Sequence, residues 1–150
     1  PESIAAAEKG LDLSPNQADV VVQSAWTFAL TGRADEAIPL VERALRLNPF
    51  PPDWFFSALG DSLLFANRAE EAVVAHRKCV DRIPDFIWCQ FGLTVAYAES
   101  GKMDRATIQA KEIMRINPRI TATDNAYVRS IGMPKDRERV ARALRQAGLM

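Results

Sequence analysis

The sequence predicts an all-α protein: a right-handed α-solenoid of three helical hairpins that ends in a C-terminal capping helix. The first observation is a phrase that occurs three times, at residues 32–37, 67–72 and 101–106, as Gly-Arg-Ala-Asp-Glu-Ala, Asn-Arg-Ala-Glu-Glu-Ala and Gly-Lys-Met-Asp-Arg-Ala. The second is the proline that follows each phrase, at 49, 84 and 118. Prolines 35 and 34 residues apart, in register with a repeated phrase, indicate stacked units that bury their apolar faces against one another.

Each unit is predicted to be a pair of helices, because apolar residues with helical spacing both precede and follow the phrase. In the first unit they are Val21, Val22, Ala25, Trp26, Phe28, Ala29 and Leu30 before it and Ala37, Ile38, Val41, Ala44 and Leu45 after it. Gly32, Asn67 and Gly101 stand between the two helices, since glycine and then asparagine best tolerate the left-handed backbone of a helix C-terminus. The second helix must end before the proline, which disfavours helical geometry in the residue ahead of it.

The whole chain is predicted to be one domain with five parts. They are a half-repeat at 1–17, repeats at 18–51, 53–86 and 87–120, and a C-terminal helical cap at 121–150. We interpret 4–13 as the second helix of an earlier hairpin, whose first helix has been cut away. The first residue is Pro1 rather than Met, so we expect the sequence to be a piece of a longer chain.

The cap is predicted to hold two helices. A short one covers 123–130, with Thr121 or Thr123 as its N-cap, and an amphipathic one covers 135–147. On the second helix we expect Val140 to face the array and Arg139 to face solvent. A repeat array needs a terminal element with a polar outer face, and this helix suits that role.

Composition excludes several classes of protein. Hydrophobic residues are 48%, charged residues 25% and the mean hydropathy is −0.12, a balance typical of a globular domain. No apolar run reaches the ~18–20 residues of a membrane span, so we expect no membrane insertion. Two cysteines are too few for a disulfide framework, which favours a cytoplasmic location.

Charge is divided unevenly along the chain. Residues 1–75 hold 5 Lys and Arg against 11 Asp and Glu, a net charge of −6, and residues 76–150 hold 14 against 8, a net charge of +6. Because a solenoid keeps sequence order in space, we expect an acidic end and a basic end. Such a separation favours weak self-association, head to tail, although a homodimer joined at both N-terminal ends stays open.

The repeats resemble the tetratricopeptide repeat (TPR). The second unit matches its pattern best, at Phe56, Leu59, Gly60, Leu63, Ala72, Cys79 and Pro84. Thr94 departs from it, where glycine is usual, and Pro51-Pro52 add one residue between units. The resemblance covers roughly residues 18–120, and it implies a protein-interaction module whose first helices line a concave face.

A narrower resemblance involves two segments. Residues 47–56 (Leu-Asn-Pro-Phe-Pro-Pro-Asp-Trp-Phe-Phe) and the tail at 136–149 look like the C-terminal TPR region of bacterial class III adenylate/guanylate cyclases. In that family the catalytic domain precedes the repeats. The resemblance therefore implies a regulatory or scaffolding region of a larger bacterial signalling protein, without catalysis in this chain.

We predict no catalytic site, no metal and no cofactor. His76 and Cys79 lie one turn apart on one helix, with Cys89 ten residues on, but a metal site needs three or four ligands. His76 and Cys79 fall on packing positions of the repeat, so core packing is favoured over a metal or redox role. Arg137, Arg139, Arg142 and Arg145 cluster on the last helix, but Asp136 and Glu138 interrupt them. A solvated surface is therefore favoured over nucleic-acid binding.

The predicted partner groove is lined by the first helices. Counting along these helices assigns Val22, Trp26, Leu30, Trp54, Asp61, Phe65, Trp88, Phe91 and Val95 to it. Aromatic side chains anchor interfaces well, so we expect a protein, a peptide or the parent chain itself to bind here. Packing of the same aromatics within the hairpins is the open alternative. For function, a non-catalytic interaction module is the first prediction and self-association of an attached effector domain is the second.

Overall fold

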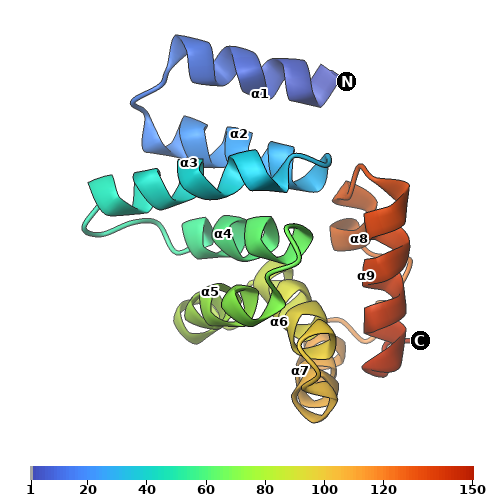
Figure 1. Ribbon diagram of the computed structural model, residues 1–150. Helices are drawn as coiled ribbons and strands as arrows, with labels where there is room; N and C mark the ends of the chain where they lie inside the picture. Colours follow the sequence, from blue (N-terminus) through green and yellow to red (C-terminus); the bar gives the residue numbers. More distant parts are fainter. Residues whose placement is uncertain (1) are drawn as a thin grey trace.

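The structure is a computed structural model that describes residues 2–150, and its elements there are helices (Figure 1). They are α1 (Glu2–Leu13), α2 (Ala18–Leu30), α3 (Ala34–Leu47), α4 (Trp54–Phe65), α5 (Ala69–Arg82), α6 (Ile87–Glu99), α7 (Met103–Ile116), α8 (Ala126–Ser130) and α9 (Pro134–Gln146). The predicted all-α solenoid is confirmed. The hairpins are α2 with α3, α4 with α5 and α6 with α7, and the first helices α2, α4 and α6 pack in sequence order.

The turn inside each hairpin has the same backbone geometry. Gly32, Asn67 and Gly101 have φ angles of 92°, 63° and 80°. After each of them, the next N–H donates back across the turn to a carbonyl five residues earlier. These bonds are Arg33 to Phe28 (2.8 Å), Arg68 to Leu63 (2.9 Å) and Lys102 to Tyr97 (2.8 Å). They satisfy carbonyls that the helix end would leave unpaired, so the predicted left-handed helix ends are confirmed.

Glycines let the second and third hairpins approach closely around one histidine. A Cβ atom at Gly60 on α4 would lie 2.6 Å from the ring of His76, and one at Gly92 on α6 would lie 2.2 Å from it. His76 and Cys79 are fully buried on α5, so their predicted role in the core is confirmed. Among residues 2–150, no group of three or more His, Cys, Asp or Glu side chains is placed to hold a metal ion.

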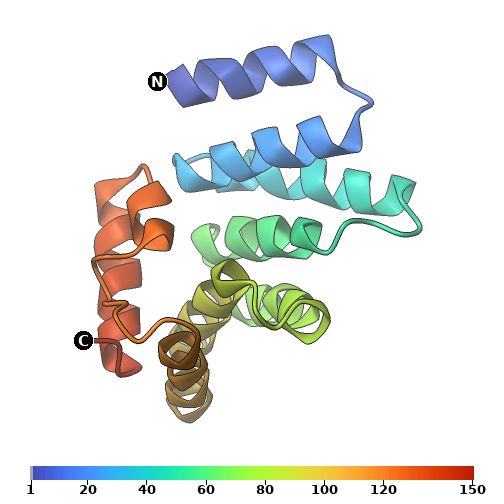
Figure 2. The same ribbon diagram turned by 180° about the vertical axis from the view of Figure 1, so that it is seen from behind.

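The C-terminal segment turns back along the array instead of extending it. Figure 1 and Figure 2 both show α8 and α9 beside the ends of α2 and α4. The Gly132 N–H donates to the Leu30 carbonyl (2.8 Å), which ties the α8–α9 connection to the first hairpin. Helix α9 packs mainly on α6 and touches α7. The segment therefore joins parts of the chain that are about a hundred residues apart.

Two expectations for this segment were wrong. The N-cap of α8 is Asn125, whose side chain accepts from the Val128 N–H (2.8 Å), whereas Thr121 accepts from Asp124 ahead of the helix. The Arg139 side chain does not face solvent: it pairs with Glu99 and donates to the Leu64 carbonyl (2.7 Å). Arginine pairs well with this partly buried carboxylate because its donors form a fixed fork that matches the two carboxylate oxygens.

No helix within residues 2–150 combines the length and the apolar character that a membrane crossing requires.

Candidate protein-interaction surface

The structure divides the nine predicted groove residues into two groups. Five of them are buried: Val22, Asp61, Phe65, Phe91 and Val95. The other four are partly exposed: Trp26, Leu30, Trp54 and Trp88. A partner can therefore reach only the second group in this state of the protein.

Tyr127, on α8, accounts for much of the burial toward the C-terminal end of the groove. Its ring stacks on Phe91 with centroids 5.4 Å apart and planes 5° apart, and it meets Trp88 edge to face at the same distance. The Tyr127 side chain has no exposed surface. This part of the groove is occupied by the chain itself, and repeat counting could not show it because α8 lies outside the repeats.

Asp61 is a buried carboxylate on α4 that joins four elements. It accepts hydrogen bonds from the Tyr127 hydroxyl and the Trp26 indole N–H, both at 2.7 Å. His76 Nε2 lies 3.2 Å from the same carboxylate. A buried carboxylate is costly unless it is hydrogen-bonded, so the Trp26 and Tyr127 donors offset the desolvation of Asp61. Burial, and then the Asp61 charge, hold the pKa of the Tyr127 phenol well above its usual value.

Three tryptophans form what we call the tryptophan cluster: Trp26, Trp54 and Trp88. Trp26 is central, with Trp54 stacked on one side (6.0 Å, 16°) and Trp88 edge-on at the other (6.1 Å, 85°). Its bond to Asp61 holds Trp26 in one orientation. The cluster is thus a preformed aromatic surface that keeps part of its area accessible.

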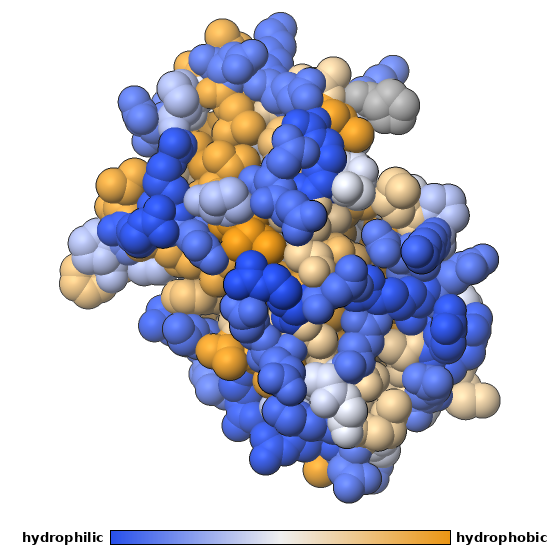
Figure 3. Space-filling view, in the orientation of Figure 1, coloured by the Kyte–Doolittle hydropathy of each residue, from blue (hydrophilic) through white to orange (hydrophobic). Residues whose placement is uncertain are grey.

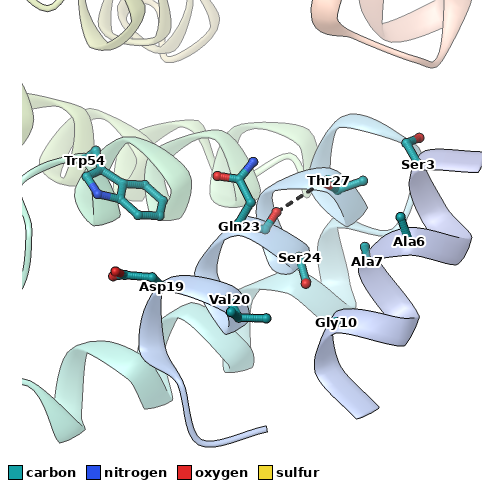
Figure 4. Close-up of a pocket in the computed structure, with 10 residues that line it drawn as sticks. All are labelled: Ser3, Ala6, Ala7, Gly10, Asp19, Val20, Gln23, Ser24, Thr27 and Trp54. Carbon is teal, nitrogen blue, oxygen red and sulfur yellow. Dashed lines mark hydrogen bonds between the residues drawn. The ribbon is translucent and has the colours of Figure 1, made fainter. Parts of the chain in front are cut away.

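Two hollows adjoin the cluster. The first, which we call the α1–α2 cleft, has a volume of about 590 Å³ and reaches from α1 past α2 to Trp54 (Figure 4). The second, of about 280 Å³, lies between Trp26 and Trp88 and is completed by Gln23, Thr27, Leu30 and Phe86. Gln23 and Thr27 line both hollows, which makes the two neighbours along α2.

Sequence reasoning missed Gln23, Thr27 and Phe86. Gln23 lies one helical turn before Trp26, so the period of the helix was a signal that could have found it. Phe86 lies ahead of α6, outside the helical count that produced the groove set.

The surface around the cluster is mainly apolar. Of the residues that the structure describes, 2–150, Asp19 is the one charged residue that lines either hollow. Figure 3 shows one face of the molecule, on which hydrophobic side chains gather over the α1–α3 end while the lower and right-hand parts are mostly hydrophilic. The arrangement suits an apolar or aromatic ligand segment with a positive charge near Asp19.

Comparison with known proteins shows a local similarity of sequence and a similarity of fold. No protein-family model matches the chain. The peroxisomal targeting signal receptor of Saccharomyces cerevisiae is 34% identical over 67 residues, which is 45% of this chain and 11% of the receptor. The chain therefore spans about a ninth of that receptor's length.

Solved structures resemble the chain over nearly all of its length. The crystal structure of MamA gives a TM-score of 0.65 at 18% identity, covering 96% of this chain and 84% of MamA. YrrB, described as a TPR protein with an unusual peptide-binding site, gives 0.64 at 19% identity over 96% of this chain and 74% of YrrB. The fold is of the TPR type. At these identities the likeness concerns the TPR-type architecture, and the binding surface must be argued from this chain's own residues.

Proposed function

We propose that this TPR-type domain is a non-catalytic protein-interaction module that binds a peptide segment at the tryptophan cluster. One observation carries the proposal: Trp26, Trp54 and Trp88 form a prearranged aromatic surface, partly exposed, between two apolar hollows. Large aromatic side chains that are already held in place lose little entropy on binding, so they contribute strongly to an interface.

The chemistry of the lining defines the kind of ligand. Aromatic and aliphatic side chains of the peptide would fill the two hollows, and a Lys or Arg would lie near Asp19. The named proteins that share the fold support this proposal, since YrrB is described as having a peptide-binding site.

Selection from a random peptide display library tests the proposal. Peptides enriched on the protein should carry aromatic or aliphatic residues next to a basic one. Trp54→Ala should weaken a selected peptide about 30-fold or more, the scale of an interface hot spot of about 2 kcal/mol. Val74→Ala is the matched control, because Val74 is an exposed apolar residue on α5, outside both hollows. Selection of no peptide, or equal loss in both variants, contradicts the proposal.

We further propose that the module is the regulatory C-terminal region of a larger bacterial signalling protein in the cytoplasm, such as a nucleotide cyclase. The support is the resemblance of residues 47–56 and 136–149 to that class. In the first of these segments, Phe50 is 95% exposed and Trp54 belongs to the tryptophan cluster. The gene sequence upstream of residue 1 decides this: a cyclase domain is expected there, and its absence overturns the proposal.

Self-association is the second candidate function. The observation that favours it is the accessible face of α1 in the α1–α2 cleft, where Ser3 and Ala6 are exposed.

A further inference from the structure

A third hollow adjoins the tryptophan cluster, and we call it the α6–α8 hollow. It has a volume of about 400 Å³ and is lined by residues of α6, of α8 and of the segment 117–125 that connects α7 to α8. Trp88 lines both this hollow and the second hollow of the cluster. The two hollows are therefore neighbours that share one aromatic side chain.

The charge of the α6–α8 hollow is opposite to that of the surface on the other side of the cluster. Arg119 and Arg129 line the hollow against one acidic residue, Asp124. Within residues 2–150, Asp19 is the one charged residue that lines either of the other two hollows. Each hollow shares lining residues with the next, so the lining changes along the row from a negative charge on α2 to a net positive charge beyond α6.

The polar groups of the α6–α8 hollow are mostly hydrogen-bond donors that a ligand can use. The Arg119 side chain is exposed and forms no ion pair with any described residue. Arg129 gives one N–H to Asp124 and keeps its other donors. The Asn117 side-chain oxygen accepts from the Arg119 backbone N–H (3.1 Å), which leaves its amide N–H groups to donate. A lining with more donors than acceptors, most of them charged, suits an oxyanion.

The backbone that carries these groups is already in place. The buried Asn125 side chain donates to the Thr121 carbonyl and accepts from the Val128 N–H, both at 2.8 Å. Tyr127, two residues before Arg129, is fully buried. Groups that are held in position before binding lose little entropy when a ligand arrives, so this hollow has the character of a preformed site.

We propose that the α6–α8 hollow binds an acidic side chain, Asp or Glu, of the same peptide that occupies the tryptophan cluster. The inference rests on the function proposed above and adds a charge order to its ligand. The peptide residue that fills the second hollow is flanked by a basic residue on the Asp19 side and by an acidic residue on the side of Arg119 and Arg129. The carboxylate accepts N–H bonds from the two guanidinium groups, whose forked donors match its two oxygens.

The same charges disfavour a ligand with the reverse order. A basic residue in the α6–α8 hollow would meet two guanidinium groups, and the one carboxylate there, Asp124, already pairs with Arg129. An acidic residue at the other end of the row would meet Asp19. Because like charges repel, the lining selects one direction of the peptide as well as its composition.

Peptides from the display selection described above test the inference, synthesised with blocked ends so that only their side chains carry charge. The selected sequences should place Asp or Glu beside the apolar residue, on the side away from the basic one. Replacement of that acidic residue by Gln, and Arg119→Glu in the protein, should each weaken binding about fivefold or more. These losses should be measured at about 0.1 M salt and should shrink at about 1 M salt, where the screening length falls to about 3 Å.

A charge swap makes the test specific. A peptide with Lys in place of the acidic residue should bind Arg119→Glu more tightly than it binds the parent protein. Arg142→Glu is the matched control, because Arg142 is an exposed arginine on α9 outside the three hollows. It changes the net charge by the same amount as Arg119→Glu, so its affinity for the acidic peptide should stay close to that of the parent.

Three results overturn the inference: selected peptides without an acidic preference, no loss on replacement by Gln, or equal loss in the two arginine variants. Because both arginine side chains are exposed, both variants should keep the parent's circular dichroism and melting temperature. The outcome is separable from the function proposed above. Peptides that depend on Trp54 but not on Arg119 overturn this inference alone, whereas selection of no peptide overturns both.

Discussion

The two ends of the concave groove use the same repeat position for opposite purposes. Trp54 and Trp88 lie 34 residues apart at equivalent places on α4 and α6. At the C-terminal end Trp88 packs edge to face on the buried ring of Tyr127 and keeps only part of its surface accessible, whereas at the N-terminal end Trp54 lines an open cleft. A TPR-type array thus presents a series of similar surfaces, and a segment outside the repeats decides which of them become core.

The occupied end also shows what the groove accepts. Tyr127 places a flat ring between Phe91 and Trp88 and directs a hydroxyl donor at Asp61. The open end presents stacked indoles and an acidic side chain, Asp19, at its edge. An aromatic residue with a donor or a cation beside it fits both ends, so Tyr127 is an intramolecular example of the ligand chemistry proposed for the tryptophan cluster.

The largest expected effect on stability comes from Gly60→Leu, which disturbs a helix contact that supports both ends of the groove. In Gly60→Leu the new side chain begins 2.6 Å from the ring of His76, which is fully buried and would also lie 2.2 Å from a Cβ atom at Gly92. Overpacking of this kind costs about 1–3 kcal/mol or more, and in a stacked array the loss spreads to neighbouring hairpins. Thermal and urea unfolding should show a larger drop than for Trp88→Ala. The reverse order would mean that Trp88 supports the fold more than the helix contact at Gly60 does.

Tyr127→Phe should destabilise only the C-terminal end of the groove, which Tyr127 occupies. The ring keeps its stack on Phe91, but Asp61 loses one of its donors in a buried site. An unsatisfied buried group costs about 1–3 kcal/mol, so the free energy of unfolding should fall by that amount. Ser130→Ala serves as a control on the same helix, because its partly exposed hydroxyl bonds only to the Tyr127 carbonyl. Equal stability of Tyr127→Phe and the parent would contradict the role given to this hydroxyl.

Alkaline pH should reduce stability through the same phenol. Burial and Asp61 raise the pKa of Tyr127 in the folded protein. The contribution of its neutral form to stability is therefore fully present below about pH 10, the pKa of a tyrosine in the unfolded chain. Above that pH the unfolded chain releases the proton and the folded protein does not. The free energy of unfolding should therefore fall as pH rises, by about 1.4 kcal/mol at about pH 11. Urea unfolding of the parent and of Tyr127→Phe across this range measures the difference, and parallel curves would contradict it.

Trp54→Ala should have a modest effect on stability and the clearest effect on binding. Trp54 is partly exposed and contacts the core through Phe55 and Trp26, so we expect a loss of about 1–2 kcal/mol, below the usual cost of a fully buried aromatic residue. The melting temperature and the affinity for a selected peptide should be measured on the same sample. A variant that loses stability but keeps its affinity would place the binding surface elsewhere.

Local features of the fold were predictable because neighbouring residues decide them. The helix ends at Gly32, Asn67 and Gly101 follow from the backbone freedom of those residues, and the structure gives each a positive φ. The burial of His76 follows from its place in the repeat. The candidate site was predictable in part: counting found all three tryptophans of the cluster, but it could not rank their exposure.

By itself, the sequence determined the helical repeat, its turns and the apolar character of the first helices, since periodicity and turn chemistry act over a few residues. Only the tertiary structure decided which parts of the concave face stay open. That decision depends on contacts between distant segments, such as Tyr127 with Asp61 and Gly132 with Leu30. The tertiary structure also places the Arg139 side chain toward the interior. The partly buried carboxylate of Glu99 lies within its reach only after α9 packs on α6.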